Sequence, residues 1–317
     1  MTPKGLFFAS DVHGSEVCFR KFLSAARVYN VDVLILNGDL TGKAIVPIVK
    51  QPDGTFEATF LNRKRTAGTD QELQELVKSV RFSGYYSYIA TPEEAEMLRT
   101  DKIESDRVFS QLMIETLRDW IRIAEERLKD TPVKCFINAG NDDIPEVDSA
   151  LKSSERIIDP EDNVVRIDDR HEMITTGYSN ITPWNAPRDI PEEDLAARID
   201  RMASKVVDMK NCIFNFHCPP YDSGLDIAPR LDDDLRPMIQ ASGIEMAPVG
   251  SKAVRDAITK HQPLLGLHGH IHESRGAVKL GRTLCLNPGS EYGEGILRGV
   301  LVTLSDARVE RHLFTQG

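Results

Sequence analysis

The chain has 317 residues, of which 41% are hydrophobic and 28% are charged, and these values exclude a disordered, collagen-like or coiled-coil protein. Its 39 Lys and Arg residues against 49 Asp and Glu residues give a net charge of −10. That charge weighs against a nucleic-acid or anionic-membrane partner, because both favour a basic face. No stretch approaches the roughly 20 apolar residues that span a bilayer, and the apolar run at 6–9 is shorter than an export-signal core. We therefore expect a cytoplasmic protein, with its five scattered cysteines reduced.

The first forty residues predict a strand, a helix and a second strand. Apolar runs at 6–9 and 33–36 flank a helical pattern at 17–26. This alternation is typical of a parallel βαβ unit whose strands are buried on both faces. Further apolar runs that predict strands lie at 133–139, 173–177, 212–216, 264–267, 283–287 and 300–304.

A stretch of different character, residues 40–132, separates the second predicted strand from the third. It contains a basic cluster at 62–65, a tyrosine-rich cluster at 85–88 and a long amphipathic helix whose apolar stripe runs from Phe109 to Leu128. Removing its 93 residues leaves 317 − 93 = 224, a reasonable size for one domain. We therefore expect a single domain, 1–317, with a helical insertion. Three roles stay open for the insertion: a cap over a cleft, an oligomer surface, or a helical layer over the sheet.

Asp, Asn and His residues follow the predicted strands at the points where the strands end. In chain order they are Asp11, His13, Asp39, Asn141, His217, His270 and His272. Open parallel sheets place their ligands at the carboxyl edge, so we expect these seven side chains to meet. Residues two apart in an extended segment point the same way, which lets Asp11 and His13 serve one site, and likewise His270 and His272.

Two Asp, one Asn and four His residues are more protein ligands than one ion takes while it keeps room for water. The set therefore predicts two ions. Imidazole and carboxylate without thiolate suit Zn, Fe, Mn, Co or Ni better than Mg or Ca, which prefer oxygen ligands alone. Two such ions about 3.5–4 Å apart are a standard device for hydrolysing phosphate esters.

The same residues form five short blocks along the chain. These are Asp-Val-His at 11–13, Gly-Asp at 38–39, Gly-Asn-Asp-Asp at 140–143, His217, and Gly-His-Ile-His at 269–272. Their order resembles the pattern of the calcineurin-like metallophosphoesterase superfamily, which is D-x-H, G-D, G-N-H-D/E, H and G-H-x-H. The resemblance implies an α/β fold with two mixed β-sheets packed face to face and flanked by helices. It also implies one ion held by Asp11, His13 and His272, a second held by Asn141, His217 and His270, and Asp39 bridging both.

Asp142 departs from the family pattern, because the family has a histidine there that contacts the phosphate and helps the leaving group depart. An ionised carboxylate repels phosphate, so Asp142 must be protonated with a raised pKa, turn away, or be offset by a nearby cation. We therefore expect a preference for phosphodiesters or for esters whose leaving group needs little protonation. Asn141 is expected to help place the phosphate, and Asp142 or a metal-bound water is the candidate acid. Arg275 is a further candidate contact to substrate.

The resemblance thus implies a dinuclear metal-dependent phosphoesterase in which a metal-bridging hydroxide attacks phosphorus, with phosphodiesters as the favoured substrates. Two alternatives stay open. One is hydrolysis of phosphomonoesters or phosphoproteins, and the other is a non-catalytic metal-binding scaffold on the same fold.

Overall fold

The computed structural model describes residues 4–232, 234–241 and 243–317. Its helices are α1 (Glu16–Val28), α2 (Asp70–Phe82), α3 (Pro92–Thr100), α4 (Lys102–Leu128), α5 (Glu146–Leu151), α6 (Glu192–Ala203) and α7 (Lys252–His261). None of these described helices is both long enough and apolar enough to cross a membrane.

Two six-stranded sheets form the centre of the molecule. The first has the order β22 (Arg308–Gln316), β21 (Arg298–Ser305), β1 (Lys4–Ser10), β2 (Val33–Asn37), β7 (Lys134–Asn138) and β8 (Ile157–Ile158). The second has the order β19 (Gly276–Leu280), β20 (Thr283–Asn287), β18 (Leu265–Leu267), β13 (Cys212–Phe216), β10 (Glu172–Thr176) and β9 (Val164–Arg166). Strands β1, β2 and β7 pair in parallel, and so do β10, β13, β18 and β20.

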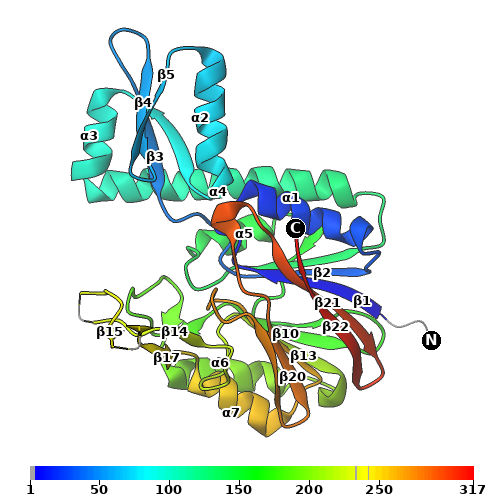
Figure 1. Cartoon of the computed structure of the whole chain (residues 1–317). Coiled ribbons are helices and arrows are strands. Elements are labelled where there is room, and N and C mark those ends of the chain that lie inside the picture. The colour runs from blue at the N-terminus through cyan, green and yellow to red at the C-terminus, as the bar shows by residue number, and fades with distance from the viewer. Residues whose placement is uncertain (1–3, 233, 242) are drawn as a thin grey trace.

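The two sheets pack face to face between two layers of helices (Figure 1). Side chains alternate along a strand, so Phe8 and its neighbour Phe7 point to opposite faces of the first sheet. Phe8 packs with Ile213 of β13 in a core cluster between the sheets, whereas Phe7 packs with residues of α1 and α4. On the far side, Phe214 packs with residues of α6 and α7. This four-layer arrangement confirms the fold class that the sequence predicted.

The insertion differs from the helical one that we expected. Residues 45–100 contain a four-stranded sheet in the order β5 (Arg63–Ala67), β4 (Phe56–Phe60), β3 (Ile45–Lys50) and β6 (Tyr86–Ala90), together with α2 and α3. This unit has its own core, which includes Ile48 and Val80, and it stands clear of the four layers (Figure 1). Its strands were not predicted because Pro47 interrupts the apolar run of β3, which argues against a central strand, and because β5 is a basic edge strand.

Helix α4 connects this small unit to the main layers. The predicted apolar stripe is confirmed, since Leu117, Trp120 and Ala124 lie in the same core cluster as Phe19 of α1. The Trp120 and Phe19 rings stack with their centroids 4.4 Å apart. The C-terminal half of α4 therefore belongs to the outer helix layer of the first sheet, and the separate unit ends before this helix.

Replacing Trp120, which is 2% exposed, with alanine should lower the free energy of unfolding by about 3–5 kcal/mol, because it empties a large volume of the core between α1 and α4. Urea denaturation measures the change. Trp184, the other tryptophan of the chain, is 65% exposed, and Trp184→Ala is the matched control with an expected change below about 0.5 kcal/mol. Equal effects of the two substitutions would contradict this account of α4.

Candidate metal centre

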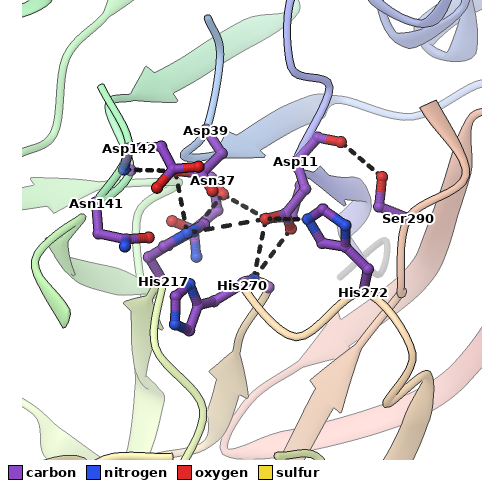
Figure 2. A network of polar contacts seen from close by, with 12 residues as sticks. Asp11, Asn37, Asp39, Asn141, Asp142, His217, His270, His272 and Ser290 are labelled. Carbon is purple, nitrogen blue, oxygen red and sulfur yellow. Dashed lines mark hydrogen bonds and ion pairs between the residues drawn. The ribbon is translucent and has the colours of Figure 1, made fainter. Parts of the chain in front are cut away.

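The seven predicted ligands lie where the parallel strands of both sheets end. Ligand atoms in two groups approach within 4.8 Å of one another: Asp11, His13, Asp39 and His272 in one group, and Asp39, His217 and His270 in the other. The first sheet supplies the ligands up to residue 141, and the second supplies the three later histidines. Figure 2 shows the side chains of Asp11, Asp39 and the three later histidines converging, with Asn141 beside the second group.

Asp39 is the residue that the two groups share. Its Oδ2 lies 3.5 Å from Nε2 of His13, and its Oδ1 lies 3.4 Å from Nε2 of His217. One carboxylate oxygen therefore faces each group, as a bridging carboxylate requires. This division of the side chains is the same as the one that the sequence resemblance implied, and the binding of ions to them stays a prediction.

The backbone of this edge is locally strained. Asp11, His13, Asp39 and His270 have φ values of 56°, 37°, 48° and 66°, in the left-handed region that residues other than glycine seldom adopt. Such strain persists where the surrounding structure enforces it, and it is concentrated at functional sites. At Gly140 a Cβ would lie only 2.2 Å from the Asp39 backbone nitrogen, so the ends of β2 and β7 meet without room for a side chain.

The buried carboxylate of Asp143 joins the loop after β2 to the loop after β7. Its oxygens accept hydrogen bonds from the backbone nitrogens of Leu40 and Thr41, at 2.9 Å each, and from Gly140 at 2.8 Å. The Thr41 hydroxyl donates a further bond of 2.6 Å. Asp39 and Asn141 are thereby held at a fixed separation although about a hundred residues lie between them.

The hydrogen bonds around the cluster leave two buried atoms available for metal ions. The Nδ1 atom of His217 lies 3.0 Å from the Asn37 carbonyl oxygen, which can only accept, so the proton resides on Nδ1 and Nε2 carries the lone pair. The Nδ2 group of Asn141 donates to Asp189 at 3.1 Å, which directs Oδ1 away from that contact. Among the described residues, His217 Nε2 and Asn141 Oδ1 have no hydrogen-bond partner. Unpartnered lone pairs beside two buried carboxylates fit divalent ions.

Electrostatics distinguish Asp39 from Asp142. Burial opposes ionisation of Asp39, but in the metal-free centre His217 carries a second proton on Nε2, and this positive charge outweighs burial and holds the pKa of Asp39 well below its usual range. An ion at Nε2 would take the place of that proton. The charge of Asp39, followed by burial, raises the pKa of Asp142 to about 6. The Lys43 ammonium acts in the opposite direction, with its Nζ 3.4 Å from Asp142 Oδ2. Of the three outcomes expected for Asp142, the structure thus favours a raised pKa together with a nearby cation.

Arg275, the further candidate contact to substrate, lies beside the ring of Phe314. Its guanidinium carbon is 5.0 Å from the centre of the Phe314 ring, on strand β22. Such cation–π contacts are favourable. The arginine packs against the first sheet through this ring, and its contact to substrate stays a prediction.

Three residues of the site were missed by the sequence reasoning: Lys43, Asp189 and Asp143 in its linking role. Asp143 stands within the predicted Gly-Asn-Asp-Asp block, and this position is the signal that points to it. Lys43 and Asp189 lie in no motif, and only the folded structure brings them to the site.

Asp189→Asn should lower the metal affinity of the site by about 10–100-fold, because an amide cannot accept from Asn141 and from the Thr182 and Ala186 donors at once. Titration with a metal-ion indicator measures the affinity. The control is Asp208→Asn, since Asp208 likewise accepts from an asparagine amide, that of Asn211, but precedes β13 at its opposite end. An affinity equal to that of the control would show that Asp189 does not orient Asn141.

No protein-family model matches this chain. An uncharacterized protein of Methanocaldococcus jannaschii, MJ1162, is 33% identical over 151 residues, which are 47% of this chain and 61% of that relative's length. Among solved structures, TT1561 of Thermus thermophilus has a TM-score of 0.55 at 15% identity, with 99% of each chain covered. Yfce, a phosphoesterase from E. coli, has a TM-score of 0.34 at 12% identity, with 98% of each chain covered.

The likeness to TT1561 extends over the whole chain at low identity, so it shows a shared fold. That fold carries the five blocks in the predicted order, and it gathers their side chains at one edge of the two sheets. The expected fold of two packed sheets flanked by helices is thereby confirmed, and the calcineurin-like metallophosphoesterase superfamily is the family that the five sequence blocks resemble.

Proposed function

We propose that the protein is a dinuclear metal-dependent phosphoesterase, a hydrolase of phosphate ester bonds that favours phosphodiesters. The observation that carries this proposal is the pair of ligand groups that share Asp39 at the common edge of both sheets. Two divalent transition-metal ions (Mn, Fe, Zn, Ni or Co) bound there supply an activated water and positive charge for the phosphate oxygens.

The residues of the chain have distinct parts in this proposal. One ion would be held by Asp11, His13 and His272, the other by Asn141, His217 and His270, and Asp39 would serve both. The Asn37 carbonyl fixes the tautomer of His217, and Asp189 fixes the amide of Asn141. Five of these ligands are buried, His270 and His272 are partly buried, and the low dielectric around them would strengthen the attraction of bound ions for a phosphate.

The preference for diesters rests on the Asp142 side chain. Its backbone nitrogen donates to Asp39 Oδ1 at 3.1 Å, which holds Asp142 beside the shared carboxylate (Figure 2). A phosphomonoester carries up to two negative charges at neutral pH and a diester carries one. A carboxylate here therefore repels the monoester more strongly than the diester.

The competing proposal is a scaffold of the same fold that binds metal without catalysis. Metal analysis of the purified protein and one assay separate the two. Turnover of bis-aryl phosphates with added Mn, Ni, Zn or Co supports the enzyme. A protein with no bound transition metal and no turnover of either bis-aryl or mono-aryl phosphates contradicts it.

Asp39→Asn should reduce turnover of a bis-aryl phosphate by at least about a hundredfold, because the amide loses the negative charge and one of the two oxygens that face the ligand groups. Rate measurement together with metal content by mass spectrometry tests this. Asp53→Asn is the matched control, since Asp53 is an exposed loop residue that caps Thr55. A variant at position 39 with the full rate and both ions would contradict the bridging role.

Asp142→His should raise monoester turnover relative to diester turnover, because it replaces an acidic side chain with one that can carry positive charge. The ratio of kcat/KM for a mono-aryl phosphate to that for a bis-aryl phosphate is the measurement. An unchanged ratio would show that Asp142 does not set the preference.

A further inference from the structure

The first residues of the insertion, 41–44, which we call its root, place a lysine beside the candidate metal centre. Lys43 lies between Thr41, which the Asp143 carboxylate holds, and the start of β3. The backbone nitrogen of Gly42 donates to the Tyr86 hydroxyl at 2.8 Å, and the carbonyl oxygen of Ala44 accepts from the Tyr86 backbone nitrogen at 3.0 Å. The backbone on both sides of Lys43 is therefore fixed, by the main sheets through Asp143 and by the insertion through Tyr86.

The side chain of Lys43 reaches a position that a ligand in the centre can approach. Its Nζ lies 3.4 Å from Asp142 Oδ2, and the two side chains are 49% and 36% exposed. Asp142 is in turn hydrogen-bonded through its backbone to Asp39 Oδ1. A single chain of contacts thus runs from the shared carboxylate to the Lys43 ammonium.

Stability alone does not account for this ion pair. Exposed pairs of this kind contribute only about 0–1 kcal/mol to folding. Without Lys43, however, Asp142 would place an uncompensated negative charge next to Asp39 at the site where a phosphate has to bind. The pair is neutral overall, and its ammonium keeps hydrogen-bond donors that can point toward a ligand.

We infer that Lys43 contacts the substrate phosphate and that the neutral Lys43–Asp142 pair selects singly charged phosphodiesters. This inference rests on the proposed function. The ammonium donates to one non-bridging phosphate oxygen, while the carboxylate disfavours any further negative charge on the substrate. In the family a histidine stands at the position of Asp142 and contacts the phosphate. Here Lys43 supplies the positive charge for that contact. The insertion contributes to the site through its root, by fixing this lysine.

Lys43→Met and Lys43→Arg test the contact to phosphate. Binding of inorganic phosphate to the metal-loaded protein is measured by calorimetry, with metal content, KM and kcat for a bis-aryl phosphate determined alongside. Lys43→Met should weaken phosphate binding by about tenfold or more and raise KM, with metal content unchanged, because it removes a hydrogen bond to a charged group. Lys43→Arg keeps the charge and should retain most of the affinity.

Lys260→Met is the matched control for the lysine. Lys260 Nζ lies 2.8 Å from Asp200 Oδ1 in an exposed pair between α7 and α6, on the outer face of the second sheet. The phosphate affinity of Lys260→Met should equal that of the unmodified protein. Equal affinities for Lys43→Met and Lys260→Met, or loss of metal from Lys43→Met, would overturn the inference.

Asp142→Asn tests the selection by charge, with Asp200→Asn as its matched control. Removing the carboxylate leaves Lys43 unpaired, so phosphate should bind several-fold more tightly and the ratio of monoester to diester turnover should rise. The double variant Lys43→Met with Asp142→Asn has no net charge at the two positions. Its ratio of monoester to diester turnover should therefore return toward that of the unmodified protein. An unchanged ratio of monoester to diester turnover in Asp142→Asn would contradict the selection of singly charged phosphodiesters.

Different results would contradict the hydrolase activity and the contact of Lys43 with phosphate. Absence of turnover in the unmodified protein, with phosphate binding that still depends on Lys43, would contradict the hydrolase and leave the contact supported. Turnover that is indifferent to Lys43→Met would contradict the contact and leave the hydrolase supported.

Discussion

The structure depends on the face-to-face packing of two mixed sheets whose parallel strands have their carboxyl ends at a common edge. The apolar side chains between the sheets, including Phe8 and Ile213, set how the end of β1 lies against the end of β13. Because this core fixes both sheets, Asp11 meets His272 although 261 positions separate them, with Asp11 Oδ1 3.3 Å from His272 Nε2. The candidate metal centre is therefore a consequence of the core, and a weaker core would loosen both ligand groups together.

The same edge concentrates charge that the protein must neutralise. Asp11 and Asp39 are both buried, and buried carboxylates are costly unless cations or donors accompany them. Histidines, backbone donors and the Lys43 ammonium each offset part of this charge, and bound divalent ions would offset more. The net acidity of the chain therefore says little about the field at this edge, where an anionic ligand meets a cationic environment once ions are bound.

The sequence predicted those site residues that directly follow a strand recognisable from its apolar run. Residues such as Asp11 and His217 follow buried parallel strands, and strand ends can be recognised from apolar runs. Lys43 could not be found in that way, because its position depends on Asp143 and Tyr86, which are distant in the chain. The insertion sheet was missed because Pro47 interrupts the apolar run of β3, and proline argues against a central strand, while β5 is exposed and basic. The contact of Arg275 with Phe314 could not be predicted either, because Phe314 comes from the last strand.

The carboxylate of Asp143 closes a loop of about a hundred residues, since its partner Thr41 is 102 positions earlier in the chain. The entropy of closing a loop grows only with the logarithm of its length, so doubling the loop costs about 0.6 kcal/mol more. Within this segment the outer unit at residues 45–100 is thus free to lengthen or diverge in evolution at little thermodynamic cost to the centre, whereas α4 and β7 belong to the core of the main layers. The residues that precede the outer unit are not free either, because they hold Lys43. Relatives that exchange the outer unit but keep this short root would inherit the same charge selection while acquiring a new surface.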